Sequence, residues 1–165
     1  MRKLTRVILL LSLWASAVWA DPVPKPDPAM EYFAQVGKLA SQGDVAAQAC
    51  LGELYGTGLG VTTDVEKQFY WESIAANKGS DGGKLDVAKA YAWGGGAQKD
   101  PKRALALVQG LAAKGYLPAE TTLGVLYVTG TGVAQDSDEA MRWFKKAALA
   151  GDFEGQVRLG LRSEE

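Results

Sequence analysis

The chain has 165 residues and a net charge of −1, with 18 basic and 19 acidic residues. This balance provides no strongly basic surface for phosphates, so it argues against a nucleic-acid partner. The sequence contains no histidine, which excludes enzymes that rely on histidine as a general base, on Ser-His or Cys-His pairs, or on the usual zinc sites. We therefore expect no cofactor and no metal.

Residues 1–20 have the pattern of a secretory signal peptide. Three basic residues precede an apolar run from Val7 to Val18, and a turn-forming Asp-Pro follows Ala20. The apolar run is shorter than a comfortable bilayer crossing, so we expect cleavage after Ala20 and no stable membrane insertion afterwards. The expected location is the periplasm, with secretion as the alternative.

A proline-rich segment at 21–28, DPVPKPDP, predicts an extended linker, because proline cannot continue a helix. The segment 29–42 is predicted to form a helix that caps the N-terminal end of the fold.

The rest of the chain repeats itself with a period of 36 residues. Glycines with this spacing are Gly43, Gly79, Gly115 and Gly151, and aspartates are Asp64, Asp100 and Asp136. A sustained period of this length is typical of stacked helical repeats. It divides the chain into repeat 1 (43–79), a degenerate repeat 2 (80–115), repeat 3 (116–151) and a C-terminal half repeat or cap (152–165).

Each repeat is predicted to form two helices joined by a tight turn. In repeat 1, residues 44–56 place apolar side chains at spacings of three and four, which indicates one buried helical stripe. Gly58 and Gly60 supply the positive φ of the turn, Asp64 is placed to cap the second helix, and Gly79 suits the residue that ends it. The predicted fold is an all-α αα-solenoid of about three 36-residue helix-turn-helix repeats plus flanking half repeats.

Other repeat-matched residues predict how the helices pack. Trp71 and Trp143 occupy matching places in the second helix and are expected in the core. Asp136 and Glu139 have the spacing of a capping box. Small residues in the first helix, which allow neighbouring helices to approach closely, are Gly52, Ala88, Gly124 and Gly160.

Two segments, Ala46–Gly79 and Ala119–Gly151, resemble the Sel1-like repeat. Both carry Leu-Gly, a tyrosine three residues later, Gly-x-Gly-Val, an aspartate, then a tryptophan and Ala-Ala before a terminal glycine. The resemblance covers Gly43–Leu161 and implies a right-handed, TPR-like superhelix of antiparallel helix pairs. It also implies binding to another protein, since bacterial members act as adaptors, as host-interaction factors, and as periplasmic immunity proteins that block type VI secretion toxins.

Repeat 2 departs from the pattern. Three glycines within residues 79–83 predict that its first helix starts late or frays. Trp93 stands in the turn, where the neighbouring repeats have threonine, and we expect it to be partly exposed. It is either an anchor for a partner or a side chain that folds back over a neighbouring helix.

The candidate protein-binding residues are Trp93 and the first-helix positions that packing does not use. Such positions line the inner surface of a solenoid, although an ordinary solvated face also varies between copies. Cys50, the only cysteine, is expected to be half-buried filler rather than a reactive thiol. The candidates are Cys50, Glu53, Asp86, Lys89, Trp93, Thr122, Val125 and Arg158.

We expect a protein without catalysis of its own that binds another protein. The resemblance favours an immunity protein that neutralises a type VI secretion toxin, and the alternative is an envelope adaptor, a regulator or a host-interaction factor. A remote alternative, a cell-wall hydrolase, requires Glu53 and Asp86 to face one cleft. Other carboxylate pairs, such as Asp64 with Glu66, are expected to cap helices. We expect a monomer, or weak self-association through the apolar edge of the half repeat.

Overall fold

The computed structural model describes residues 27–162, which form eight helices and no strand. In chain order the helices are α2 (Pro28–Ser41), α3 (Val45–Thr57), α4 (Val65–Asn77), α5 (Asp81–Trp93), α6 (Pro101–Ala113), α7 (Leu117–Thr129), α8 (Ser137–Leu149) and α9 (Phe153–Arg162). The predicted signal peptide and residues 21–26 of the predicted linker lie outside the described residues.

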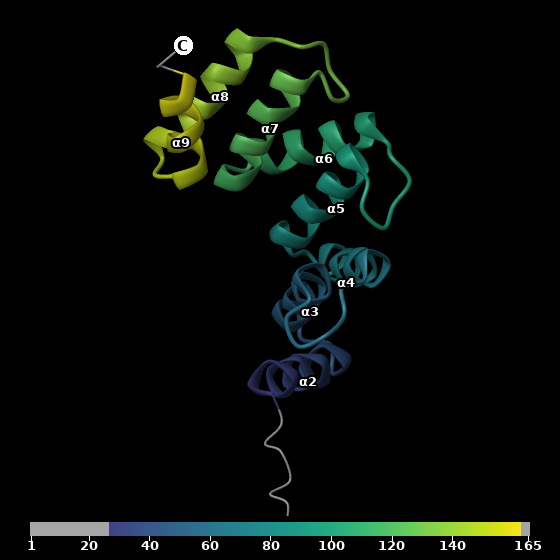
Figure 1. The fold of residues 1–165 in the computed structure, drawn as a ribbon. Coiled ribbons are helices and arrows are strands. Elements are labelled where there is room, and N and C mark those ends of the chain that lie inside the picture. Colours follow the sequence, from purple (N-terminus) through teal and green to yellow (C-terminus); the bar gives the residue numbers. More distant parts are fainter. Residues whose placement is uncertain (1–26, 163–165) are drawn as a thin grey trace, which may run out of the picture.

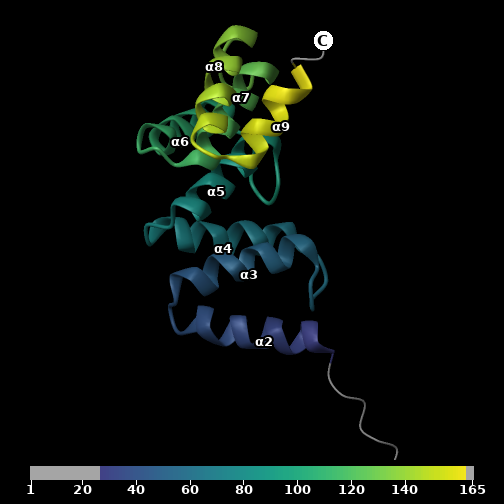
Figure 2. The same cartoon turned by 90° about the vertical axis from the view of Figure 1, so that its left-hand side faces the viewer.

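Consecutive helices pack against each other in a single row, so the described chain is an all-α solenoid, as predicted. Figure 1 shows the row rising from α2 and then bending over to α9. The helices α3, α5, α7 and α9 lie along the hollow side of this bend, on the left in Figure 1. Figure 2 shows α2, α3 and α4 stacked as successive layers. We call the hollow side the inner face.

One backbone hydrogen bond closes the turn between the two helices in every repeat, although Gly94 of repeat 2 has a ψ of 144° where Gly58 and Gly130 are left-handed. The backbone N–H groups of Asp64, Asp100 and Asp136 donate to the carbonyls of Tyr55, Tyr91 and Tyr127, with N···O distances of 2.9 to 3.0 Å. Gly60 has a φ of 73° and lies against the Ala29 carbonyl of α2. Both its backbone conformation and the lack of room for a Cβ therefore require glycine. Stacking therefore demands this glycine as much as the turn does.

Aspartate caps the second helix of each repeat. The Asp64 carboxylate accepts from the Lys67 N–H at 2.9 Å, and the Asp136 carboxylate accepts from the Glu139 N–H at 2.9 Å, as predicted. The backbone bond and the ion pair with Lys67 lower the pKa of Asp64. The reciprocal bond of a capping box is absent at Asp136, because the Glu139 carboxylate accepts from Arg142 at 2.7 Å instead.

The buried apolar residues form two clusters along the row. The first includes Leu51 and extends from α2 to α3, and the second includes Leu123 and extends from α5 to α7. Trp71 packs against the first cluster and Trp143 against the second, and both rings are half-buried. These tryptophans therefore border the core rather than fill its centre.

Two of the predicted glycines allow close approach of the paired helices, and a third does not. A Cβ on Gly124 would overlap the Phe144 ring, and a Cβ on Gly52 would lie 2.8 Å from Cγ of Glu72. Gly160 on α9 has open space around its Cβ position. Close approach is possible only where a second helix follows, and none follows α9 within the described residues.

The prediction that the first helix of repeat 2, α5, starts late is wrong. Helix α5 begins 36 residues after the start of α3 and has the same length of 13 residues, so its start is not delayed. The Ser80 hydroxyl caps it by accepting from the Gly83 N–H at 3.1 Å. A Cβ on Gly83 would lie 3.0 Å from both the Glu72 carbonyl oxygen and the Ala76 nitrogen. The glycine that lowers helix propensity is thus the residue that lets α5 dock on α4.

Candidate functional site

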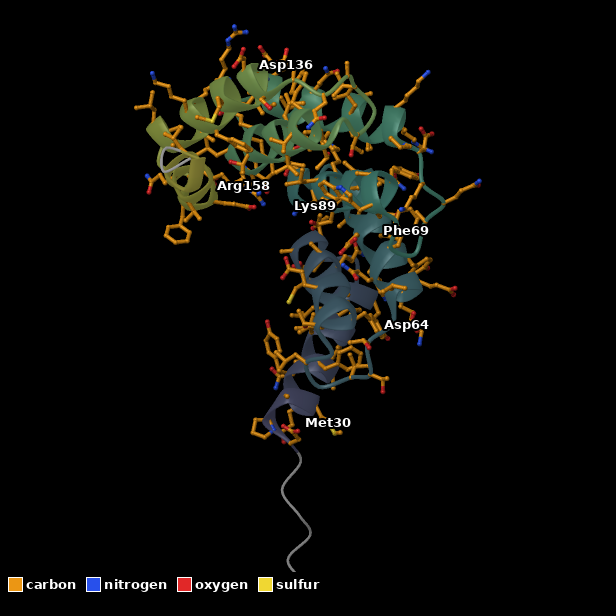
Figure 3. The ribbon with its side chains drawn as sticks, turned by 45° about the horizontal axis from the view of Figure 1, so that its top comes forward. Met30, Asp64, Phe69, Lys89, Asp136 and Arg158 are labelled. Atoms are coloured by element: carbon orange, nitrogen blue, oxygen red, sulfur yellow. The ribbon has the colours of Figure 1, made fainter. Side chains whose placement is uncertain are left out.

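A pocket of about 290 Å³ lies between α4 and α5. Helix α5 contributes Asp86, Lys89 and Trp93, three of the residues predicted from the sequence, and α4 contributes Gln68 and Glu72. Figure 3 shows Lys89 at the inside of the bend in the solenoid. We call this feature the α4–α5 pocket.

Glu72 is a buried carboxylate in the wall of this pocket, with only 3% of its surface exposed. It accepts a hydrogen bond from Gln68 Nε2 at 2.8 Å, and no ion pair within residues 27–162 includes it. Burial raises the pKa of Glu72 to about 7, and the charges of Asp86 and Glu53 act in the same direction, whereas the Gln68 hydrogen bond and Lys89 oppose them. Its carboxyl group therefore exchanges its proton near neutral pH.

The repeat register shows that packing does not require Glu72. The residues 36 and 72 positions further on are Val108 and Phe144, which are buried in the core. Sequence analysis missed Glu72 because it followed the residues that agree between repeats. The sequence does contain a signal, because Glu72 is a carboxylate at a repeat position where the two later repeats have apolar residues.

Trp93 is the last residue of α5 rather than part of the turn. Its side chain is 40% exposed and lines the pocket. At the matching positions the hydroxyls of Thr57 and Thr129 bond back to carbonyls of their own helices, both at 2.9 Å. The middle repeat thus places a large ring where its neighbours have a small, locally satisfied side chain.

Charged groups from three helices meet around the pocket. Asp86 and Lys89 form an ion pair at 3.3 Å, and Glu53 is exposed on α3. Tyr116 precedes α7 at the position where α3 and α5 have a capping residue, and it makes no capping bond. Burial, then the charges of Asp86, Asp81 and Glu53, raise the pKa of Tyr116. Asp81 and Asp86 are paired with lysines here, whereas Glu53 is in none of the ion pairs of residues 27–162.

The remaining candidates lie elsewhere on the inner face. Cys50 is half-buried, with Sγ 3.3 Å from the Tyr32 hydroxyl of α2. Val125 is half-buried on α7. Arg158 pairs with Glu154 at 2.7 Å on α9, and Figure 3 shows it on the same hollow side as Lys89. These residues extend the surface around the pocket but do not line it.

Thr122 differs from the expectation that it would present a surface to a partner. It is only 7% exposed, and its hydroxyl donates to the Pro118 carbonyl at 2.7 Å. It shares its register with Asp86 and Arg158, whose side chains are longer. The threonine side chain is too short to extend beyond the packed helix surface, so it contributes little to the inner face.

A second buried carboxylate, Glu120, has a structural partner. It is 2% exposed, and its Oε1 pairs with Lys146 Nζ at 2.8 Å. Lys146 Nζ also lies 4.9 Å from the centre of the Trp143 ring. Glu120 is thus compensated by a cation within the fold, whereas Glu72 is not.

Residues 27–162 show neither a metal site nor a membrane-spanning helix. No group of acidic or cysteine side chains there is arranged to hold a metal ion. None of the helices in this range combines the length and the hydropathy that a bilayer crossing requires.

The fold is similar to two solved structures. A Sel1 repeat protein from Oxalobacter formigenes superposes with a TM-score of 0.69 at 30% identity, over 80% of this chain and 54% of that one. A protective antigen present in uropathogenic Escherichia coli strains, which has an SLR fold, superposes with a TM-score of 0.67 at 31% identity, over 79% of this chain and 28% of that one.

Similarity also extends to a curated eukaryotic protein. Chitin synthase regulatory factor 3 of Schizosaccharomyces pombe is 32% identical over 123 residues, which cover 73% of this chain but only 13% of that protein. The chain therefore matches one part of a much longer relative. The Sel1 repeat model matches residues 45–80, 83–116 and 118–152, which is more than half of the sequence. The chain belongs to the Sel1 repeat family.

Proposed function

We propose that this chain is a non-catalytic scaffold that holds a partner protein on its inner face, with the α4–α5 pocket as the anchor point. Sel1 repeats mediate protein–protein interaction, and a preformed row of helices loses little conformational entropy on binding. The observation that carries the proposal is Glu72, which is 3% exposed where the other repeats have Val108 and Phe144. Burying an unpaired carboxylate lowers stability, so its presence points to binding.

The pocket has the size and chemistry to receive one side chain of a partner. Its volume of about 290 Å³ is bordered by Trp93, and partly exposed tryptophans are the residues that most often concentrate binding energy. Glu72 and Asp86 supply carboxylate acceptors in the wall. A partner side chain with N–H donors therefore matches the pocket.

Affinity capture with matched variants tests this proposal. Wild type, Trp93→Ala and Thr129→Ala are immobilised and exposed to extracts of the source cells, and retained proteins are quantified by mass spectrometry. Thr129 is the repeat-matched control for Trp93. We expect one partner to be retained by wild type and Thr129→Ala and to be lost from Trp93→Ala. Equal retention by all three proteins would show that the pocket is not the anchor point.

A regulatory adaptor is the form of this function that the comparisons favour, since a relative at 32% identity is named a regulatory factor. Its partner would be a protein resident in the same cell. Deleting the gene should then change the cell envelope even in a strain that makes no toxin.

An immunity protein against a type VI secretion toxin is the second form, suggested by the family resemblance and the signal-like segment 1–20. The gene should then be dispensable in a strain without the toxin and essential beside a toxin-producing neighbour. Export, on which this form depends, is tested by fusing residues 1–28 to alkaline phosphatase, which is active only outside the cytoplasm.

The hydrolase alternative has one observation in its favour. Glu72 is a carboxyl group with a pKa near 7 beside Asp86, which is the kind of pair that general acid catalysis uses. Glu53 does not line the pocket, so the predicted pair of Glu53 and Asp86 does not share that space. Cell-wall hydrolysis by the purified protein that is lost in Glu72→Gln would revive this alternative, and no hydrolysis by wild type would remove it.

A further inference from the structure

A second and larger depression lies on the opposite side of the solenoid from the inner face. It occupies about 1140 Å³ between the turn after α5 and the turn after α7. Phe69 and Tyr91 line it, and Figure 3 shows Phe69 on the side away from the hollow. Its basic residues are Lys99, Lys102 and Arg103. We call it the turn-side groove.

The three cations of this groove have no carboxylate partner in residues 27–162. All the ion pairs of this range involve other basic residues. Asp100 is the single acidic residue that lines the groove, and its Oδ1 accepts from the Arg103 backbone N–H at 3.1 Å as a helix cap. The groove is therefore locally positive although the chain as a whole has a net charge of −1.

An aromatic wall supports the basic residues. The Arg103 guanidinium lies 4.5 Å from the centre of the Tyr91 ring. The Tyr91 ring in turn meets Phe69 edge to face, with ring centres 5.8 Å apart. Stacking on an aromatic ring restrains a guanidinium while leaving its N–H donors free for a ligand. Val133 adds an apolar side chain to the facing turn.

The repeat register shows that the fold does not require these charges. The backbone hydrogen bond that closes the turn and the aspartate cap of the second helix are present in all three repeats. Each of the three cations has a matching position in the other repeats, 36 residues away. In the order of repeats 1, 2 and 3, the matching residues are Thr63, Lys99 and Gln135; Glu66, Lys102 and Asp138; and Lys67, Arg103 and Glu139. The middle repeat has three cations where repeat 3 has none and has two acids instead. Because the closing bond and the cap form without these cations in the other repeats, the charges are available for binding.

We propose that the turn-side groove binds an acidic polypeptide segment of a partner protein. Side-chain carboxylates of the segment pair with Lys99, Lys102 and Arg103, and its apolar side chains contact Phe69 and Val133. The groove is separate from the α4–α5 pocket, so both can be occupied at once. The chain then joins two protein surfaces rather than binding one.

Fluorescence anisotropy of the full chain with a labelled peptide tests this proposal. The probe is a short peptide of alternating Glu and Asp with one central Leu, and its control replaces the acids by Gln and Asn. We expect the acidic probe alone to bind, and its affinity to fall by about tenfold or more when salt rises from about 50 mM to about 500 mM.

Two triple variants with the same change in charge locate the site. Lys99→Gln, Lys102→Gln, Arg103→Gln should weaken binding by about tenfold or more. Lys38→Gln, Lys78→Gln, Lys145→Gln changes exposed cations elsewhere and should alter affinity by less than about twofold. All of these residues are exposed, and Lys78→Gln removes the side-chain hydrogen bond from Lys78 Nζ to the Gly43 carbonyl at 3.0 Å. Both variants should therefore keep the helical circular dichroism spectrum of wild type and melt close to its melting temperature.

Several outcomes would overturn the proposal. Equal weakening by the two triple variants would mean a general charge effect without a site. Binding of a single-stranded oligonucleotide through the groove, with no binding of the acidic peptide, would assign it to nucleic acid instead. If Trp93→Ala lost peptide binding while the groove triple variant kept it, the peptide would bind at the inner face instead. None of these outcomes decides the proposed function of the α4–α5 pocket, which is tested separately.

Discussion

The helix pairs α3–α4 and α7–α8 share one backbone plan and differ in what fills it. A glycine of the first helix, Gly52 or Gly124, faces the same position of the second helix. In α8 that position holds the ring of Phe144, whereas in α4 it holds the side chain of Glu72, whose Cγ lies nearest to the glycine. The comparison shows that the repeat tolerates a different side chain at this position without a change of fold, so packing alone does not explain the carboxylate of Glu72.

Phe144→Ala should have the largest effect on stability, because it removes a side chain that is 3% exposed and leaves a cavity against Gly124. We expect a loss of about 3 to 5 kcal/mol in the free energy of unfolding, measured by urea denaturation. Phe153→Ala is the control, since Phe153 is 77% exposed and should change little. A loss below about 1 kcal/mol for Phe144→Ala would mean that α7 and α8 are not packed as described.

Glu72→Gln should stabilise the protein at high pH. The folded pKa of about 7 lies above the reference value of 4.5, so the folded state favours the protonated carboxyl. The contribution of Glu72 to stability is thus fully present below about pH 4.5 and is lost as pH rises to about 7. A shift of this size corresponds to a loss of about 3 kcal/mol.

The measurement is urea denaturation of wild type and Glu72→Gln at pH 5 and pH 8. Glu66→Gln is the matched control on the same helix, because Glu66 is exposed. We expect Glu72→Gln to exceed wild type at pH 8 and to approach it at pH 5. A difference between the two proteins that does not change with pH would contradict the burial of this carboxyl.

Lys146→Met tests whether Glu120, unlike Glu72, depends on a cation partner. It removes the cation 2.8 Å from Glu120 and leaves that group buried without a partner. We expect a loss of about 1 to 2 kcal/mol, less than for a fully buried pair because Lys146 is 55% exposed. The double variant with Glu120→Gln should recover most of the loss in thermal unfolding. No recovery would show that Lys146 acts through its contact with Trp143 alone.

Trp93→Ala should have the smallest effect on folding, since the ring is 40% exposed. We expect the free energy of unfolding to stay within about 1 kcal/mol of wild type. Binding of the captured partner should nevertheless weaken by about tenfold or more in isothermal titration calorimetry. A large loss of stability with unchanged affinity would assign Trp93 to the fold instead.

Sequence reasoning predicted most of the fold, because the features that define the repeat are local. The cap at Asp64 and the turn glycine Gly60 follow from backbone conformation alone. The prediction that α5 starts late was wrong, because helix propensity takes no account of the close contact between Gly83 and α4. That contact depends on tertiary packing.

The candidate site was predicted in part. Register predicts Asp86 and Lys89 together, Trp93 is predicted on other grounds, and the structure brings all three into one pocket. Thr122 was chosen by register, but a register position does not show how far a short side chain reaches past its neighbours. Glu72 is not among the predicted residues, although a comparison with its repeat-matched residues Val108 and Phe144 reveals it. Differences between repeats thus identify the residues of this pocket better than their agreement does.

Site-specific photo-crosslinking in the source cells tests most directly that the middle repeat holds the partner. A photoreactive amino acid replaces Trp93 in one strain and its repeat-matched counterpart Thr129 in another. We expect one discrete protein adduct from position 93 and none from position 129. Adducts of equal yield from both positions, or from position 129 alone, would contradict the placement of the partner at the α4–α5 pocket.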